Sequence, residues 1–308
     1  MEKKDLVIIG GGPAGLSAGI YASRAAMNTV LLEQGISGGL VVSTDFIENY
    51  PGFAEGISGP ELMRQMESQA CRFGLEIASA NAEQIVPVEK EFVVKTDDGE
   101  ISTGAVIIAT GAQPRLLGVF GEAEYTGRGV SYCATCDGAF FRDKKVAVVG
   151  GGDAAVEEAL FLTRFAQKVY IIHRRGELRA TRVVQQRAFE NGKIEFIWHS
   201  VVDEIHGTNT VEAVLIQDVR TGAKTQLNVD GTFIYVGYRP SSGLVRKLVR
   251  LDEKGYIITD ENMLTSIPGI FAAGDVRQKL LRQVVTAVAD GAIAAVTAEK
   301  YLEGLALL

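Results

Sequence analysis

The chain has 308 residues, 47% of them hydrophobic, and a formal net charge of −7. These values describe a globular protein with room for two domains and exclude an intrinsically disordered chain. The acidic balance argues against a nucleic-acid-binding surface, and no apolar stretch approaches the roughly 20 residues of a membrane span. Without a signal-peptide core at the N-terminus, and with three cysteines only, we expect a cytoplasmic protein.

The N-terminal segment predicts alternating strands and helices. We expect a strand at 6–9, a helix at 13–26, a strand at 29–33 and a glycine-rich loop at 35–39. Between the first strand and the helix stands Gly10-Gly11-Gly12-Pro13-Ala14-Gly15. This pattern is typical of a dinucleotide-binding unit, in which glycines permit a tight turn and a close approach of the backbone to a pyrophosphate at the helix N-terminus.

The following segment predicts the rest of a first domain. An amphipathic helix is expected at 61–73, and Gln113-Pro114 indicates a crossing into a second domain. Short strands are expected at 76–79, 92–96, 101–103 and 106–108, with a hairpin turn at Asp97-Asp98-Gly99.

The same pattern then repeats. A strand at 146–149 leads into Gly150-Gly151-Gly152-Asp153-Ala154-Ala155. A long apolar helix at 283–302 resembles neither copy, so we expect the C-terminal segment to complete the first domain. The other elements expected are a helix near 180–190 and strands at 169–172, 194–198, 211–218 and 233–236.

The predicted fold class is therefore α/β, with two Rossmann-like three-layer nucleotide-binding domains, the second inserted into the first. We expect residues 1–113 and 242–308 to form the first nucleotide-binding domain and residues 114–241 to form the second.

The two copies carry opposite charges at one corresponding position. Glu33 and His173 stand at the same distance from the first glycine of each copy, and Arg174 and Arg175 follow His173 directly, with Arg179 nearby. A carboxylate accepts a hydrogen bond from an unphosphorylated ribose and repels a 2′-phosphate, whereas basic side chains attract that phosphate. The first copy therefore suits FAD or NAD, and the second suits NADP(H).

The second domain also contains Cys133-Ala134-Thr135-Cys136-Asp137. A Cys-x-x-Cys in an intracellular chain with βαβ units favours a redox pair. A zinc site needs four ligands, and Cys71 and three scattered histidines do not supply the rest, so we expect no metal. Asp137 is expected to exchange protons with a thiolate or reduced flavin, the alternative being a turn residue. Cys71 is expected to pack within a helix.

These motifs together resemble the low-molecular-weight, bacterial-type thioredoxin reductases over essentially the whole chain. The Cys-Ala-Thr-Cys-Asp string between two nucleotide-binding folds is highly specific for that family. One departure is Leu40, because family members usually carry Gln after the pair Gly38-Gly39, which would place a polar group near FAD. The resemblance also covers Glu48-Asn49-Tyr50-Pro51-Gly52, Ala109-Thr110-Gly111, Ala272-Ala273-Gly274-Asp275 and Leu281-Arg282-Gln283.

The resemblance implies a homodimeric flavoenzyme that passes electrons from NADPH through FAD to the cysteine pair and on to oxidised thioredoxin. It also implies that Cys136 faces the flavin and that Cys133 attacks the partner's disulfide. An alternative is the same electron path serving another acceptor, such as a glutaredoxin-like or peroxidase-linked protein. A nucleotide-sensing scaffold is a further alternative, but a sensor needs no dithiol beside a flavin.

The expected site residues fall into three groups. The catalytic group is Cys133, Cys136 and Asp137. The FAD group is Gly10, Gly12, Pro13, Ala14, Gly15, Glu33, Gln34, Gly39, Leu40, Asn49, Ala109, Thr110, Gly111, Gly274, Asp275, Arg282, Gln283 and Val284. The NADPH group is Gly150, Gly152, Asp153, Ala154, Ala155, His173, Arg174, Arg175 and Arg179.

Overall fold

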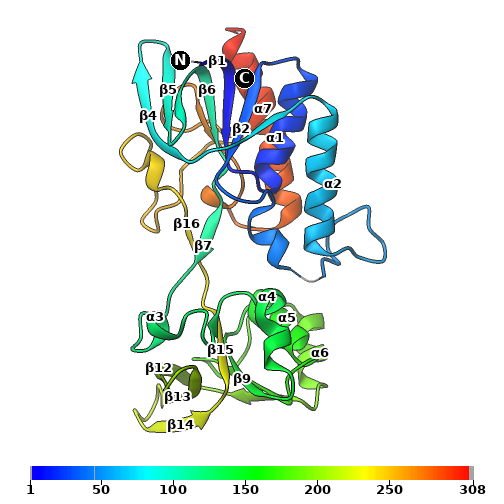
Figure 1. The fold of residues 1–308 in the computed structure, drawn as a ribbon, viewed down its shortest axis with the longest axis vertical. Coiled ribbons are helices and arrows are strands. Elements are labelled where there is room, and N and C mark those ends of the chain that lie inside the picture. Colours follow the sequence, from blue (N-terminus) through cyan, green and yellow to red (C-terminus); the bar gives the residue numbers. More distant parts are fainter. Residues whose placement is uncertain (1, 45, 305–308) are drawn as a thin grey trace. The chain divides into compact units, whose positions relative to one another are not determined.

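The computed structural model describes residues 2–44 and 46–304, and it divides into two compact units. Unit 1 is Met1–Gln113 with Arg239–Leu308, and unit 2 is Pro114–Tyr238. The α/β class with parallel sheets is confirmed (Figure 1). The second boundary falls between Tyr238 and Arg239, slightly before the expected one. Residues 1, 45 and 305–308, which the expected first domain includes, lie outside the described residues.

Unit 1 is built on a seven-stranded sheet. Its parallel part runs in the order β3-β2-β1-β6, with β17 also parallel to β6, and β5 and β4 extend it antiparallel. The strands are β1 (Glu2–Ile9), β2 (Thr29–Glu33), β3 (Glu76–Ser79), β4 (Ala82–Val88), β5 (Glu91–Thr96), β6 (Gly99–Ile108) and β17 (Ile270–Ala272).

Three helices cover one face of this sheet (Figure 1): α1 (Pro13–Arg24), α2 (Gly59–Arg72) and α7 (Val284–Leu302). Alternate residues of β1 enter different cores, with Leu6 and Ile8 packed under the helices and Val7 and Ile9 on the opposite face. A strand that is apolar on both faces is typical of a parallel sheet covered on both sides. The short 3₁₀ turns of the unit are η1 (Gly39–Ser43), η3 (Gly243–Val245) and η4 (Gly274–Val276).

Unit 2 contains a parallel sheet in the order β11-β10-β9-β15-β8 and an antiparallel sheet in the order β12-β13-β14. The parallel strands are β8 (Val130–Ser131), β9 (Lys145–Gly150), β10 (Lys168–Ile172), β11 (Ile194–Ile197) and β15 (Gly231–Tyr235). The antiparallel strands are β12 (Ser200–Gly207), β13 (Val211–Asp218) and β14 (Lys224–Asn228). The helical segments are α3 (Glu122–Tyr125), α4 (Ala134–Asp137), η2 (Gly138–Phe141), α5 (Asp153–Leu162) and α6 (Arg182–Phe189).

The chain passes between the units through two short paired strands, β7 (Ala112–Pro114) and β16 (Tyr238–Pro240). Just beyond β7, the Arg115 backbone N donates to the Gly237 carbonyl at 2.9 Å, and its Nε donates to the Tyr238 carbonyl at 2.8 Å. The incoming and outgoing segments are therefore hydrogen-bonded to each other at the start of unit 2.

Several expected elements differ from the observed ones. The strands expected at 101–103 and 106–108 form one continuous strand, β6, because Gly104 does not interrupt it. Helix α1 ends at Arg24, since Ala26 has a positive φ of 58°. Cys71 lies in α2 as expected but is exposed, so the expected packing role is wrong. Strands β4, β12 and β14 were not expected, because their apolar residues do not alternate cleanly.

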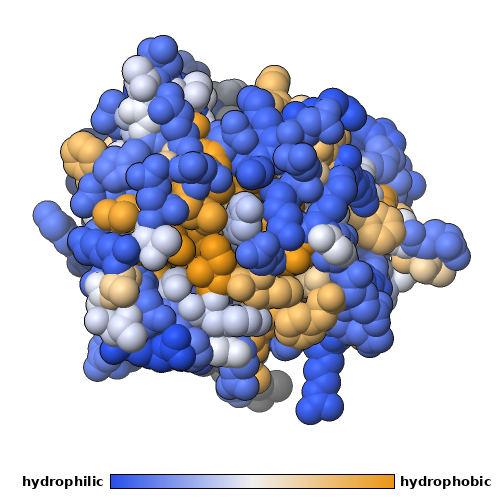
Figure 2. Space-filling view, turned by 90° about the horizontal axis from the view of Figure 1, so that it is seen from below, coloured by the Kyte–Doolittle hydropathy of each residue, from blue (hydrophilic) through white to orange (hydrophobic). Residues whose placement is uncertain are grey.

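The surface seen in Figure 2 is mostly hydrophilic, with a smaller hydrophobic area near its middle. Among the described residues, no helix is both long and apolar enough to cross a membrane.

Candidate active site

The first glycine motif forms a turn that only glycine can make. Gly10 has a φ of +109°, and a Cβ there would lie 2.4 Å from the Ala109 carbonyl oxygen. A Cβ on Gly15 would lie 1.8 Å from the Gly10 carbonyl oxygen, whereas a Cβ on Gly12 would meet no atom within 4 Å. Helix α1 begins with Pro13 and has no capping side chain. Its first turn therefore offers unpaired N–H groups and space to an anion.

The carboxylate of Glu33 binds the backbone of the same turn. Its Oε2 accepts from Gly11 N at 2.7 Å, and its Oε1 accepts from Gly35 N at 3.0 Å. A carboxylate can accept about four hydrogen bonds, so after these two it can still accept one from a ribose hydroxyl. The neighbouring residues of the expected FAD group, Gln34, Gly39 and Leu40, are exposed.

Three strand ends bring separate parts of the expected FAD group together. Ala109 N donates to Ile9 O at 2.8 Å, and Ala273 N donates to Ile108 O at 2.9 Å. The turn at Gly10, the segment 109–111 and the segment 274–275 therefore follow the carboxyl ends of adjacent strands. Ligands of open α/β sheets bind at such an edge.

Hydrogen bonds connect further residues of the expected FAD group to other parts of unit 1. Asn49 Nδ2 donates to Gln283 Oε1 at 3.1 Å, and Gln283 caps α7 in a capping box with Thr286. The Thr110 hydroxyl donates to the Ser241 carbonyl at 2.8 Å. Unit 1 thus collects the expected FAD residues, with Val284 as the first residue of α7.

Asp275 is the most distinctive group of this region. Burial raises its pKa, opposed by the charges of Lys279 and Arg282, and its Oδ1 has no hydrogen-bond partner in the described chain. A desolvated acceptor without a partner is costly unless a ligand supplies the donor. The Arg282 guanidinium lies 3.9 Å from the centre of the Tyr256 ring.

Asp290 was missed by the sequence analysis. Its buried Oδ2 accepts from Gly274 N at 3.0 Å, from Arg277 Nε at 3.0 Å and from Lys279 Nζ at 2.7 Å. It therefore fixes the turn that carries Asp275. The available signal was an acidic residue in the middle of the apolar run 284–298 of α7, because charged side chains are rarely buried unless they are paired.

The second glycine motif repeats the geometry in unit 2. Gly150 has a φ of +156°, and a Cβ there would lie 2.5 Å from the Tyr235 carbonyl oxygen. A Cβ on Gly152 would meet no atom within 4 Å, and no side chain caps the N-terminus of α5. Asp153 Oδ1 accepts from Thr181 N at 2.7 Å, which fixes the loop before α6. Ala154 and Ala155 occupy the first turn of α5, where Ala155 is buried.

His173 and the arginines occupy different environments. The imidazole is buried and lies against Gly151, where a Cβ would come within 2.4 Å of the ring. Burial lowers its pKa, as do the charges of Arg179, Arg175 and Arg174, so the ring is neutral at neutral pH. Its Nε2 has no hydrogen-bond partner within residues 2–44 and 46–304. The three guanidinium groups are exposed and supply the positive charge.

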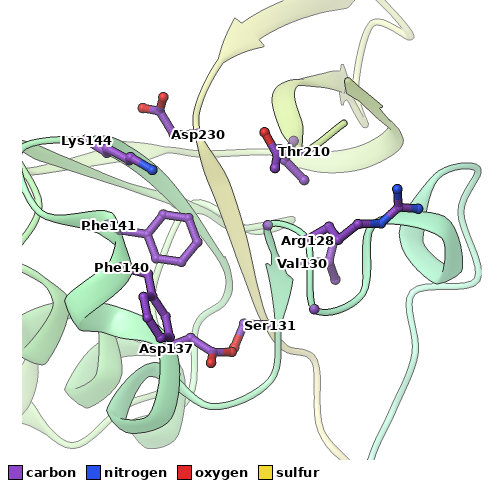
Figure 3. Close-up of a pocket in the computed structure, with 12 residues that line it drawn as sticks. Arg128, Val130, Ser131, Asp137, Phe140, Phe141, Lys144, Thr210 and Asp230 are labelled. Atoms are coloured by element: carbon purple, nitrogen blue, oxygen red, sulfur yellow. The ribbon is translucent and has the colours of Figure 1, made fainter. Parts of the chain in front are cut away.

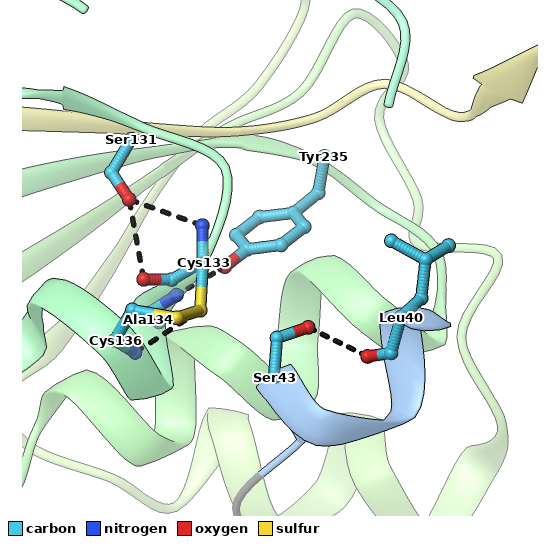
Figure 4. The surroundings of a disulfide bond; sticks show 7 residues. All are labelled: Leu40, Ser43, Ser131, Cys133, Ala134, Cys136 and Tyr235. Carbon is cyan, nitrogen blue, oxygen red and sulfur yellow. Dashed lines mark hydrogen bonds between the residues drawn. A yellow bond between two sulfur atoms is a disulfide. The ribbon is translucent and has the colours of Figure 1, made fainter. Parts of the chain in front are cut away.

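The cysteines form a disulfide at the start of α4 (Figure 4). Cys133 Sγ accepts from Cys136 N at 3.1 Å. The Ser131 hydroxyl accepts from Cys133 N at 3.0 Å and donates to Cys133 O at 3.2 Å. The Tyr235 hydroxyl accepts from Ala134 N at 2.8 Å. Cys136 is exposed and Cys133 is half-buried.

Tyr235 and Ser131 were also missed by the sequence analysis. The signal for Tyr235 was its place at the end of a predicted strand, since β15 pairs with β9 in a register that sets Tyr235 opposite Gly150. Its backbone therefore supports the glycine turn, while its hydroxyl holds the cysteine turn.

Asp137 lies on the wall of a cavity of about 250 Å³ together with Ser131, Phe140 and Phe141 (Figure 3). Its backbone N donates to Cys133 O at 3.2 Å, so it also closes the cysteine turn. Both interpretations of Asp137, proton exchange and turn formation, are compatible with this position. Within the described residues, no group of three or more His, Cys, Asp or Glu side chains is placed to hold a metal ion.

Comparisons with known proteins agree with this geometry. The family model for pyridine nucleotide-disulphide oxidoreductases matches residues 4–291. A thioredoxin reductase of Peptoclostridium litorale is 52% identical over 307 residues, covering 98% of each chain. One of Bacillus subtilis (strain 168) is 50% identical over 302 residues, covering 98% of this chain and 95% of the relative.

Solved structures give the same result. The crystal structure of Lactococcus lactis thioredoxin reductase, described as the FR conformation, matches with a TM-score of 0.96 and 51% identity, covering 98% of this chain and 100% of the other. The thioredoxin reductase of T. acidophilum matches with a TM-score of 0.93 and 35% identity, covering 97% and 99%. The chain therefore belongs to the pyridine nucleotide-disulphide oxidoreductase family and, within it, to the thioredoxin reductases, which are oxidoreductases that use a flavin and a pyridine nucleotide.

Proposed function

We propose that the protein reduces oxidised thioredoxin with electrons from NADPH, which pass through FAD to the Cys133–Cys136 pair. The observation that carries this proposal is the placement of the redox disulfide in the unit whose glycine motif is flanked by exposed arginines. The other unit carries the acidic version of the motif. One chain thus provides two nucleotide sites of opposite charge and a dithiol.

The residues of unit 1 fit FAD. Gly12 and the uncapped start of α1 leave room and donors for a pyrophosphate, and Glu33 is placed to accept an unphosphorylated ribose hydroxyl. Asp275 provides a buried acceptor that lacks a donor, which suits a polyhydroxylated chain. Leu40 is exposed and offers no polar group. When bound, FAD accepts a hydride and passes two electrons to a disulfide.

The residues of unit 2 fit NADPH. Gly152 and the start of α5 provide the pyrophosphate position, and Arg174, Arg175 and Arg179 provide charge-assisted hydrogen bonds to a 2′-phosphate. The neutral His173 ring packs against Gly151, and its Nε2 can accept a hydrogen bond. We therefore assign the phosphate recognition to the arginines and a supporting role to His173.

The cysteine pair then carries out thiol–disulfide exchange. In the reduced pair, the Cys133 thiolate attacks one sulfur of the partner's disulfide, and the partner's other sulfur leaves as a thiolate. Cys136 then attacks Cys133 Sγ, which re-forms the Cys133–Cys136 disulfide and releases the partner with both thiols reduced. Asp137 follows Cys136 directly in the chain, and we assign to it the exchange of the accompanying proton.

The test combines colour and turnover. The purified protein should be yellow, lose its flavin absorbance with NADPH and recover it when oxidised thioredoxin is added. Cys133→Ser and Cys136→Ser should each still be bleached by NADPH but lose at least about 10³-fold in thioredoxin turnover, because no exchange cycle closes with one sulfur. Cys71→Ser is the matched control, and its turnover should equal that of the native protein. Substantial turnover in either single variant would refute the dithiol mechanism.

The proposal also includes a homodimer and a cytoplasmic location, both from the family resemblance. Light scattering should give twice the chain's mass of 33.0 kDa. The competing acceptors, a glutaredoxin-like or a peroxidase-linked protein, are tested by offering each as the sole disulfide. Faster turnover with one of them than with thioredoxin would replace the acceptor but keep the electron path.

A further inference from the structure

Unit 2 buries a carboxylate that none of the proposed steps uses. Glu122 is 3% exposed, and its carboxylate accepts three hydrogen bonds. Its Oε1 accepts from Leu117 N at 2.8 Å and from the Tyr132 hydroxyl at 2.7 Å, and its Oε2 accepts from Gly118 N at 2.6 Å. A buried carboxylate is retained only where such donors satisfy it, and bonds to a charged acceptor are the strong ones.

The three donors come from two functionally different segments. Leu117 and Gly118 follow Arg115, which is hydrogen-bonded to Gly237 and Tyr238 where the chain enters and leaves the unit. Tyr132 immediately precedes Cys133. Glu122 therefore joins the entry segment of unit 2 to the segment that carries the first redox cysteine.

The Tyr132 hydroxyl is a lasting donor in this arrangement. Burial and the neighbouring Glu122 carboxylate both raise the pKa of Tyr132, so its proton stays in place throughout the neutral range. Cys133 itself is also held, because its N donates to the Ser131 hydroxyl, and the next residue is held by the bond from Ala134 N to the Tyr235 hydroxyl. The bond from Tyr132 to Glu122 connects this cysteine turn to the entry segment.

We propose that Glu122 is a positioning residue for the redox pair: through Tyr132 it fixes the Cys133 backbone, and thereby sets how fast the two cysteines close their disulfide. Glu122 contacts neither sulfur, and it acts only through the orientation of its neighbour. The inference rests on the proposed redox role of the pair. Ring closure within a pair depends on orientation, and a misplacement of about 1 Å costs on the order of 10²-fold in rate.

The test isolates ring closure from nucleotide and partner. The Cys71→Ser protein, which lacks the exposed third thiol and serves as the background for every variant, is reduced and mixed with one equivalent of an aromatic disulfide, dithiobis-nitrobenzoate. This reagent releases two coloured thiolates in sequence. The first leaves when one cysteine thiolate attacks the reagent and forms a mixed disulfide. The second leaves when the other cysteine attacks that sulfur and forms the Cys133–Cys136 disulfide. The rate of the second release measures the positioning of the pair.

Tyr132→Phe removes one hydroxyl and should slow the second release by about tenfold, the effect of one lost bond to a charged group. Tyr125→Phe is the matched control, since the Tyr125 hydroxyl is also in unit 2 but donates to Gly207 O, at 2.7 Å, rather than to Glu122. Its second release should match the native rate. Glu122→Gln should slow the release further, because an amide group cannot accept from all three donors.

Turnover with thioredoxin, per bound flavin, gives the second measurement. Tyr132→Phe should lower kcat for thioredoxin by about tenfold and leave both KM and the rate of flavin reduction by NADPH within about twofold. A merely structural role would lower the folded fraction but leave ring closure in the folded protein unchanged. Equal second-release rates in Tyr132→Phe and Tyr125→Phe would overturn the inference. A native protein that closes its disulfide but does not turn over thioredoxin would refute the proposed function alone.

Discussion

The two glycine motifs have similar turns but differ in the side chain that lies against the second glycine. In unit 1 the second glycine, Gly11, donates its N–H to the Glu33 carboxylate. In unit 2 the corresponding Gly151 lies against the buried ring of His173, while three exposed arginines follow. The comparison teaches that the same glycine turn suits a pyrophosphate in both units, whereas the proposed choice of nucleotide depends on the charge of the residues at and just after the end of the second strand.

The third position of the motif differs as well. In unit 1 a Cβ on Gly15 would lie 1.8 Å from the Gly10 carbonyl oxygen. In unit 2 the same position is Ala155, which is buried without such a conflict. Helix α1 therefore lies closer to its glycine turn than α5 does, and the third motif position accepts a smaller side chain in unit 1 than in unit 2.

The largest expected effect follows from this difference. Gly15→Ala should destabilise the protein by about 3 kcal/mol or more and abolish flavin retention, because neither the Gly10 backbone nor α1 can move without disturbing the sheet. The reverse change, Ala155→Gly, should cost only about 1 kcal/mol, the difference in helix propensity. Thermal unfolding and the ratio of flavin to protein absorbance measure both. Similar losses in the two variants would contradict the asymmetry.

A smaller effect tests the charge difference. Replacing either Arg174 or Arg175 with Ala should raise the KM for NADPH by about 10- to 150-fold, since one bond to a phosphate contributes about 1.5–3 kcal/mol. The KM for NADH should change little, because that nucleotide has no 2′-phosphate. Arg187→Ala, on α6 of the same unit, is the control for general loss of positive charge. Parallel losses for NADPH and NADH would show that the arginines do not recognise the phosphate.

The sequence predicted the elements whose hydrophobic pattern is strong. The strands and helices around both glycine motifs were predicted because buried apolar runs end at glycines, and the α/β class follows from their order. Strands β4, β12 and β14 were not predicted because they are partly exposed, and their hydrophobic pattern depends on the residues that pack against them in the folded chain. The continuous β6 was split because Gly104 resembles a break, although its space is filled by Leu302.

The site was predicted to a similar extent, and for a related reason. Motif residues such as Glu33 and Cys133 are local in sequence, so spacing identifies them. Asp290 and Tyr235 act through hydrogen bonds to backbone groups far away in the sequence, such as the bond from Ala134 N to the Tyr235 hydroxyl. No local pattern marks such partners, because strand order and register bring them together.

The smallest expected effect compares one buried titratable group from each unit. Burial raises the pKa of Asp275 and lowers that of His173, so in both cases the neutral form is favoured. The folded protein holds the Asp275 proton to a higher pH than the unfolded chain does, so this group's contribution to stability falls as pH rises past the usual Asp range. The unfolded chain takes up the His173 proton first, so that contribution falls as pH drops below about 6.5.

Substitution of Asp275 should therefore change stability in a way that depends on pH. In flavin-free protein, Asp275→Asn should raise the melting temperature near pH 8, and this rise should shrink as the pH falls and the native carboxyl takes up its proton. When FAD is added, the variant should bind it about tenfold more weakly. Asp290→Asn is the contrasting change, since it leaves Arg277 and Lys279 without their shared carboxylate and should lower the melting temperature at neutral pH. If the change in melting temperature for Asp275→Asn did not depend on pH, burial would not favour the neutral form of the Asp275 carboxyl. FAD would then meet a charged carboxylate at this position.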